Sequence, residues 1–376
     1  MPSLRPEVDP DGLLEYSVVY TDRALNHMSK RFQQVMRDLS ATLKEIYGAQ
    51  AVAIVPGSGT FAMEAVARQF VQGQRCLVVR NGWFSYRWSQ IIEQGRLSGE
   101  VSVLKARRVG EGAQAAFAPA PLGEVLEAIG REKPAVVFAP HVETASGMLL
   151  PDEYLRAIGA AVREIGGLFV LDCIASGAIW ADMRALGVDV LVNAPQKGWS
   201  GPPCAGFVML GDRALAKLET TTSDSFACDL KKWLSIMAAY ESGGHAYHAT
   251  MPTDALRQVR DVLAELRGFG LEKARAAQTE LGRRVRALLA ERGIASVAAP
   301  GFEAPGVVVS YTARDDWHKG AAFAAQGLQI AAGVPLACDE GPDFKTFRLG
   351  LFGLDKLADV DGALQRLRRS LDALNA

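Results

Sequence analysis

Two charged residues lie where a carboxylate and an amine could act on the same bound molecule. Asp172 ends the apolar run GLFVLD, and Lys197 comes shortly after the next apolar run, within APQKGW. A carboxylate at the end of a buried strand needs a cation or an N–H group as its partner. Lys197 follows 25 residues later and could face the same crevice, because ligands of open α/β sheets bind at the strand ends. The two residues form either a structural ion pair or a reactive amine beside a carboxylate.

A segment of small residues upstream could hold a phosphate. Residues 56–60 read Pro-Gly-Ser-Gly-Thr, between a predicted strand and a predicted helix. Free N–H groups at a helix start, together with the hydroxyls of Ser58 and Thr60, suit a phosphate. The same residues also favour an ordinary helix cap and turn, so both interpretations stay open. The segment is neither a P-loop nor a G-x-S-x-G nucleophile turn.

Two further segments add aromatic and polar groups at strand ends. Residues 81–88, NGWFSYRW, could stack one ring on a planar ligand, although their tryptophans favour core packing. Residues 141–147, HVETASG, follow a buried run and are more polar than packing requires. For His141 and Glu143 a supporting role is favoured over direct catalysis. A phosphate turn, a stacking ring, a carboxylate and a lysine are together what pyridoxal 5'-phosphate requires.

The elements that must position these groups alternate along the chain. Short apolar runs predict strands at 51–56, 75–80, 101–104, 135–140, 167–172, 188–193 and 205–210. Helical patterns lie at 31–47, 60–70, 83–95, 122–131 and 151–165. This alternation predicts an α/β fold with a seven-stranded, mainly parallel sheet that helices cover on both faces.

The composition and the helical and strand patterns divide the chain into three parts. Residues 1–20 indicate an N-terminal arm and residues 21–252 a large domain that binds the cofactor. Residues 253–376 indicate a small C-terminal α+β domain, joined by a long connecting helix over 254–292. Further strands are expected at 306–311 and 345–352, with a helical pattern at 356–374.

Composition excludes several classes of protein. The 376 residues carry 41 Lys and Arg against 42 Asp and Glu, so no basic surface for nucleic acid is expected. No apolar stretch is long enough to predict a membrane span, and the N-terminus does not resemble a signal peptide. Five cysteines without a C-x-x-C pair favour a reduced, cytoplasmic protein without a disulfide framework.

The chain resembles the class V aminotransferases, which are pyridoxal-phosphate-dependent enzymes of fold type I. Within that class it is most similar to alanine–glyoxylate and serine–pyruvate aminotransferases, with 2-aminoethylphosphonate transaminases nearby. The resemblance covers residues 27–375. Its motifs, in the family's order, are PGSGTFAMEA, NGWFSYR, HVETASG, LDCIAS, APQKGW, YHATMP and FRLGLFG.

The resemblance implies a role for each matching residue. Lys197 would form a Schiff base with the cofactor, and Asp172 would bind its pyridine nitrogen. Phosphate contacts would come from Ser58, Gly59, Thr60 and Gln196, ring contacts from Phe84 and Ile174, and a contact to the phenolic oxygen from Thr144. Tyr247 and Thr250 would reach the cofactor of a partner subunit, which implies a homodimer with shared active sites.

Arg348 would bind the substrate's α-carboxylate, as the resemblance implies. The alternative is an ion pair that serves only the fold, with Asp339, Glu340 or Asp343 as its partner. His248 fits a role supporting the neighbouring tyrosine better than a metal site, since no third ligand accompanies the H-x-x-H spacing. No metal is therefore expected.

The resemblance predicts transamination from alanine or serine to glyoxylate or pyruvate, so the expected partners are small amino and 2-oxo acids. A 2-aminoethylphosphonate–pyruvate transaminase is the second expectation. Two different classes of protein stay open: a lyase or cysteine desulfurase that uses Cys338, and a regulatory relative without activity. Relatives usually begin with a Gly-Pro-Gly segment that lines the substrate pocket, whereas residues 15–29 have no such glycines. The choice of substrate depends on that segment.

Overall fold

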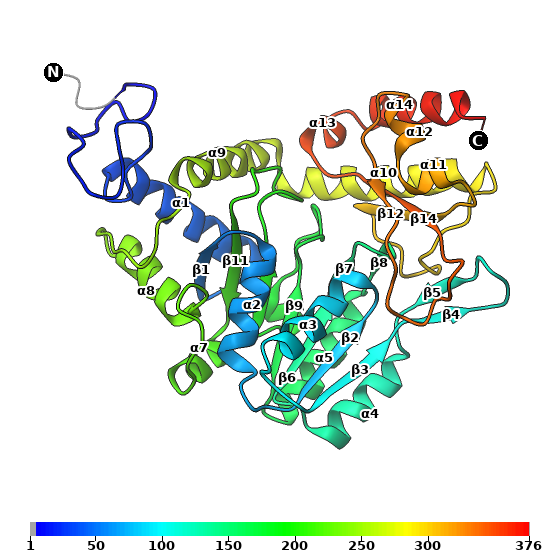
Figure 1. Ribbon diagram of the computed structural model, residues 1–376, viewed down its shortest axis with the longest axis horizontal. Coiled ribbons are helices and arrows are strands. Elements are labelled where there is room, and N and C mark those ends of the chain that lie inside the picture. Colours follow the sequence, from blue (N-terminus) through cyan, green and yellow to red (C-terminus); the bar gives the residue numbers. More distant parts are fainter. Residues whose placement is uncertain (1–4, 376) are drawn as a thin grey trace.

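A seven-stranded sheet forms the centre of the larger part of the molecule (Figure 1). The computed structural model describes residues 5–375; the first four residues of the predicted N-terminal arm lie outside the described residues. The strands of the sheet are β1 (Ala51–Pro56), β2 (Cys76–Arg80), β3 (Val101–Lys105), β6 (Val136–Pro140), β9 (Leu168–Asp172), β10 (Val190–Asn193) and β11 (Ala205–Leu210). All seven predicted runs form strands.

The sheet is mainly parallel. Its order is β1-β11-β10-β9-β6-β2-β3. Neighbouring strands from β10 to β3 pair in parallel, whereas β11 is antiparallel to both β10 and β1. All residues of β2, β6, β9, β10 and β11 are buried, as expected for strands covered on both faces. The predicted α/β class and seven-stranded sheet are therefore confirmed.

Helices pack against this sheet and connect its strands (Figure 1). They are α1 (Lys30–Tyr47), α2 (Gly59–Phe70), α3 (Trp83–Gln94), α4 (Leu122–Glu132), α5 (Asp152–Glu164), α6 (Met183–Leu186), α7 (Asp212–Glu219) and α8 (Leu230–Glu241). Two short hairpins, β4–β5 and β7–β8, lie between them, at Arg107–Val109 with Ala116–Ala118 and at Val142–Glu143 with Met148–Leu149.

The long connecting helix expected over 254–292 is two helices, which corrects the prediction. α9 (Thr253–Phe269) ends at Gly270, and α10 (Leu271–Ala290) begins directly after it. Gly270 has φ of +104°, a conformation open to glycine and costly for other residues, so the helix breaks there. α9 packs against α1, and Arg260 and Arg267 form ion pairs with acidic residues of that helix.

The C-terminal part contains a second, three-stranded sheet and short helices. β14 (Thr346–Gly350) lies between β12 (Val307–Tyr311) and β13 (Ala331–Ala332), antiparallel to both. α10 packs against α13 (Leu354–Leu357) and α14 (Val360–Ala373), and α11 (Asp315–His318) and α12 (Ala321–Ala324) precede β13. Among the described residues no helix is both long and apolar enough to cross a bilayer. The domain boundary at residue 252 stays a prediction.

Candidate functional site

The sheet brings the separate motifs to one edge. β6, β9 and β10 run in parallel, and β1 has their direction because β11 is antiparallel to both β1 and β10. The carboxyl ends of these strands therefore lie together. Ser58, Thr144, Asp172 and Lys197 follow or end these four strands.

A cavity of about 170 Å³ lies at this edge. Nine predicted site residues line it: Ser58, Gly59, Thr60, Phe84, Thr144, Asp172, Ile174, Gln196 and Lys197. Met63, Arg87, Val142 and Ala175 complete the lining. Three other predicted residues, Tyr247, Thr250 and Arg348, are not part of this wall.

Asp172 is a buried carboxyl group at the end of β9. One carboxyl oxygen, Oδ1, accepts the backbone N–H of Ile174 at 2.9 Å. Among residues 5–375 no ion pair includes Asp172. Burial raises the pKa of Asp172 from 3.8 to about 7. A buried carboxyl with a spare oxygen facing a cavity is suited to bind a positively charged N–H group.

Lys197 is largely enclosed, and burial lowers the pKa of its amine. The positive charge of Arg348 lowers that pKa further, while the charge of Asp172 raises it. A lower pKa increases the fraction of neutral, nucleophilic amine at neutral pH. The loop that carries Lys197 packs closely, because a Cβ on Gly198 would lie 2.1 Å from the carbonyl oxygen of Gly177. The lysine is thus held on a rigid turn.

The turn at residues 57–60 places the side chain of Ser58 on the cavity wall. Ser58 is the N-cap of α2, yet its side chain makes no capping hydrogen bond. Gly59 packs closely on Ile174, since a Cβ there would lie 2.6 Å from Cδ1 of that side chain. The side-chain oxygen Oε1 of Gln196 is buried and has no partner among the described residues. Because Oε1 only accepts hydrogen bonds, the groups of this wall that suit a phosphate are the hydroxyl of Ser58, the N–H groups at the start of α2 and the amide N–H groups of Gln196.

Glu143 positions the aromatic residue of the cavity. Its carboxylate accepts the backbone N–H groups of Phe84 (3.2 Å), Ser85 (2.8 Å) and Ala145 (2.9 Å), and the hydroxyl of Ser85 (2.6 Å). These bonds fix the start of α3, which carries Phe84. Glu143 therefore holds the helix in place, in line with the supporting role favoured from the sequence.

His141 and Trp88 serve the fold in the described structure. The ring nitrogen Nδ1 of His141 lies 2.8 Å from the hydroxyl of Ser176, and burial lowers the pKa of His141 to about 4. Trp88 is fully buried and stacks on Phe138. These contacts assign His141 and Trp88 to the support of the fold.

Arg348 is not engaged by the acidic residues named as its alternative partners. Its Nε donates to the carbonyl of Ala332 at 2.7 Å, and its guanidinium carbon lies 5.5 Å from the ring centroid of Phe84. Asp339 instead pairs with Lys105, and Glu340 accepts backbone N–H groups. Within residues 5–375 Arg348 forms no ion pair. The rest of its guanidinium is available to an anion beside the cavity.

Tyr247 and Thr250 lie on the surface and contact each other. The Tyr247 hydroxyl is 3.1 Å from Oγ1 of Thr250, and Tyr247 is 53% exposed. His248 does not support this tyrosine, which corrects the prediction: its Nε2 lies 2.8 Å from the carbonyl of Phe226. The ring that packs on Tyr247 is that of His27, at 5.5 Å between centroids.

No group of three or more His, Cys, Asp or Glu side chains in the described part of the chain is arranged to hold a metal ion.

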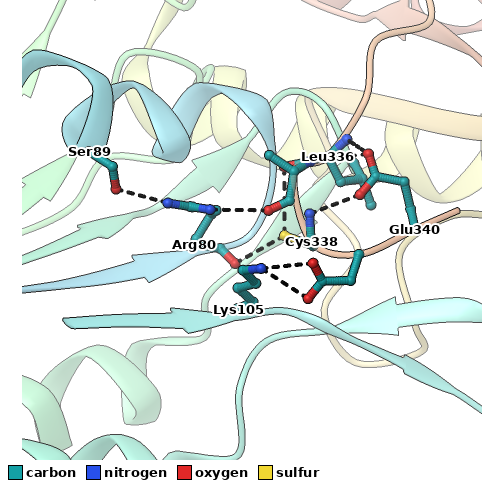
Figure 2. Close-up of polar contacts among 8 residues, drawn as sticks. Arg80, Ser89, Lys105, Leu336, Cys338 and Glu340 are labelled. Atoms are coloured by element: carbon teal, nitrogen blue, oxygen red, sulfur yellow. Dashed lines mark hydrogen bonds and ion pairs between the residues drawn. The ribbon is translucent and has the colours of Figure 1, made fainter. Parts of the chain in front are cut away.

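Cys338 lies in the loop between β13 and β14. Its side chain is only 4% exposed, and Figure 2 shows its polar contacts. Its sulfur contacts the carbonyl oxygens of Arg80 at 3.5 Å and Leu336 at 3.6 Å. Burial raises the pKa of this thiol to about 12. A reactive cysteine needs an accessible thiolate, and Cys338 in this arrangement offers none.

One cavity residue that the sequence analysis did not single out is Arg87. It lies three residues after Phe84 on α3, so both side chains share a helix face. Its Nη1 donates to Oγ1 of Thr60 at 3.0 Å. The i, i+3 spacing within NGWFSYR was the available signal, but only the packing of α3 against α2 brings Arg87 to Thr60.

No family model matches the chain. Individual proteins do match it, among them three aminotransferases. It is 30% identical over 362 residues to 2-aminoethylphosphonate–pyruvate transaminase 2 of Paraburkholderia xenovorans (strain LB400), covering 92% of this chain and 90% of that protein. It is 26% identical over 358 residues to the alanine–glyoxylate aminotransferase of Rattus norvegicus, covering 93% and 82%. Among solved structures, an aspartate aminotransferase of subgroup IV from Thermus thermophilus superposes with a TM-score of 0.75 at 27% identity, covering 93% of both chains.

Proposed function

The chain belongs to the class V pyridoxal-phosphate-dependent aminotransferases, and on that basis we propose that it transfers the amino group of alanine or serine to glyoxylate or pyruvate. The observation that carries this proposal is the cavity in which Lys197 and Asp172 meet the 58–60 turn. We propose that Lys197 holds the cofactor through a Schiff base.

The residues of the cavity fit the cofactor by their chemistry. When bound, pyridoxal phosphate supplies a ring that accepts electrons from the substrate's α-carbon. Asp172, with a free oxygen in a buried place, would hold a proton on the ring nitrogen. The N–H groups and hydroxyls of the 58–60 turn would bind the phosphate, with Gln196 beside them. Phe84 and Ile174 would enclose the ring, and Thr144 would donate to its phenolic oxygen.

Two side chains would act on the substrate. Lys197, whose amine loses charge readily in its enclosed position, would carry the proton to and from the α-carbon. Arg348 would bind the α-carboxylate with the N–H groups that Ala332 does not use.

We propose further that the active unit is a cytoplasmic homodimer. Tyr247 and Thr250 form an exposed hydrogen-bonded pair, which suits a pair that serves a cofactor in a partner subunit. Exposed apolar side chains of the arm, including Leu13, Tyr16 and Val18, are also suited to a protein interface.

A second candidate substrate is 2-aminoethylphosphonate, with pyruvate as acceptor. The relative at 30% identity that carries this activity in its name favours it. Its phosphonate would take the place of the carboxylate beside Arg348. The desulfurase hypothesis has less support, because the thiol of Cys338 is buried and its pKa is raised.

The cofactor and the substrate are tested separately. The purified enzyme is expected to show an absorption band of bound cofactor that Lys197→Ala abolishes and that Lys217→Ala, at an exposed lysine of α7, retains. An unchanged band and activity in Lys197→Ala would refute the proposal. A screen of alanine, serine and 2-aminoethylphosphonate against glyoxylate and pyruvate then identifies the donor. If the enzyme turns over none of the three donors, the substrate assignment is refuted and the cofactor assignment is not.

A further inference from the structure

Arg87 carries a positive charge into the cavity. Its side chain lines the same cavity as Lys197 and Asp172. None of the ion pairs within residues 5–375 includes Arg87. A partly enclosed guanidinium without a counter-ion is costly and attracts an anion. Arg87 is therefore a candidate ligand-binding residue; it ends the motif NGWFSYR, but the proposed function gives it no role.

The arrangement of charges distinguishes Arg87 from Arg348. Both guanidinium groups lie near the ring of Phe84, with their central carbons 5.2 Å and 5.5 Å from its centroid. Arg348 is tied to Ala332 in the C-terminal sheet, whereas Arg87 is tied to Thr60 in the predicted phosphate turn. The two arginines thus approach the ring from different elements and are placed for two different anions.

The hydrogen bond from Arg87 to Thr60 leaves the hydroxyl proton of the threonine available to another acceptor. A hydroxyl has one proton and two acceptor sites. Because Nη1 of Arg87 donates to Oγ1 of Thr60, the hydroxyl proton is not needed for that bond and is free for another acceptor. Donation from a cation also polarises the hydroxyl and makes it a stronger donor.

We propose that Arg87 is a positioning residue for the cofactor's phosphate: it holds the Thr60 hydroxyl as a donor to that group and adds a positive charge beside it. The inference rests on the proposed function, since it assumes that pyridoxal phosphate occupies this cavity. The ligand class is a phosphate ester, and the free aldehyde pyridoxal, which has no phosphate, is the matched comparison.

The test measures binding to the cofactor-free enzyme. Dissociation constants for pyridoxal phosphate and for pyridoxal are determined by absorbance for the wild type, Arg87→Gln and Arg87→Lys. We expect Arg87→Gln to weaken pyridoxal phosphate binding about 10- to 100-fold, the range for a hydrogen bond to a charged group. Pyridoxal binding should change less than about threefold, and Arg87→Lys, which keeps the charge, should recover part of the loss.

Two further variants separate the possible causes. Combining Arg87→Gln with Thr60→Val should weaken phosphate binding by less than the product of the single effects, because both act on one hydrogen bond. Arg348→Gln, the other arginine beside Phe84, should leave the affinity for both ligands within about threefold of wild type while raising KM for the amino donor.

Three results would overturn the inference. Equal loss of pyridoxal and pyridoxal phosphate binding in Arg87→Gln and Arg87→Lys would mean that Arg87 only supports α3. Unchanged cofactor binding with a raised donor KM would make it a substrate residue. Strictly multiplicative effects in the double variant would separate it from Thr60. Failure of the wild type to bind either ligand through Lys197 would refute the proposed function instead.

Discussion

At the scale of single residues, Asp172 is destabilising in the cofactor-free protein. Its pKa is about 7 when folded and 3.8 ordinarily. Between these values the folded protein holds a proton that the unfolded chain releases, so the free energy of unfolding falls as the pH rises. For one group with these pKa values the loss between pH 5 and pH 8 is about 2–3 kcal/mol.

We therefore expect the stability of cofactor-free Asp172→Asn to depend less on pH than that of the wild type. Urea unfolding of both proteins at pH 5 and pH 8 measures the difference. The variant should gain relative to the wild type at pH 8, because the asparagine side chain carries no charge to be buried there. Identical pH dependence in the two proteins would contradict the assigned pKa of Asp172.

Arg348 offers a second prediction at this scale. Removing one partner of a desolvated ion pair costs on the order of 2–5 kcal/mol, which is roughly thirty- to several-thousand-fold. Arg348→Ala should lower kcat/KM for α-amino acids within this range, measured with the best donor from the screen. Arg366→Ala, a half-exposed arginine on α14, serves as the control. A loss below about threefold would leave Arg348 with a role in the fold only.

At the scale of elements, one carboxylate accepts three backbone N–H groups in the loop between β13 and β14. Glu340 accepts the backbone N–H groups of Leu336 (2.6 Å), Ala337 (3.1 Å) and Cys338 (2.8 Å) (Figure 2). Ala337 has φ of +59°, in the left-handed region that side chains disfavour. Arg80 donates to the carbonyl of Ala337, which joins the loop to the end of β2.

Glu340→Gln replaces a carboxylate that has two accepting oxygens with an amide that has one. At least one buried N–H group should then lose its acceptor, at a cost of about 1–3 kcal/mol in the free energy of unfolding. Denaturant unfolding of the variant beside Asp343→Asn, an exposed acid of the same loop, measures this. Equal stability of the two variants would show that the loop does not depend on Glu340.

At the scale of the whole molecule, the proposed dimer makes a quantitative prediction. Each active site would combine Lys197 of one chain with Tyr247 and Thr250 of the other. Mixing Lys197→Ala with a Tyr247→Phe/Thr250→Ala double variant should create hybrids with one complete site each. Random exchange of subunits would restore about a quarter of wild-type activity.

Two differently tagged chains, purified through both tags, would verify that exchange took place. Activity no higher than the mean of the two parents in such hybrids would exclude shared sites. Sedimentation of an active monomer would exclude the dimer itself.

The sequence by itself determined the sheet and the residues at its edge. Strands that are buried on both faces are apolar along their whole length. Runs such as AVVFAP and GLFVLD could therefore be recognised from the sequence as buried strands. Since such strands end at one edge, Ser58, Thr144 and Lys197 could be placed together from the order of the strands and motifs. The break at Gly270 was missed because helical composition continues on both sides of it, and only the backbone conformation of one glycine divides the helices.

Tertiary structure alone decided the partners of the charged groups. The hydrogen bond from Arg87 to Thr60 joins α3 to α2. The hydrogen bond from the backbone N–H of Ser85 to Glu143 joins residues that are 58 positions apart. Likewise, His27 rather than His248 packs on Tyr247, and Arg348 is left without an acidic partner in the described part of the chain. Hydrogen bonds and ion pairs depend on separations of a few ångströms between distant segments. Residue types and spacing along the chain do not specify such separations; the packing of the helices on the sheet does.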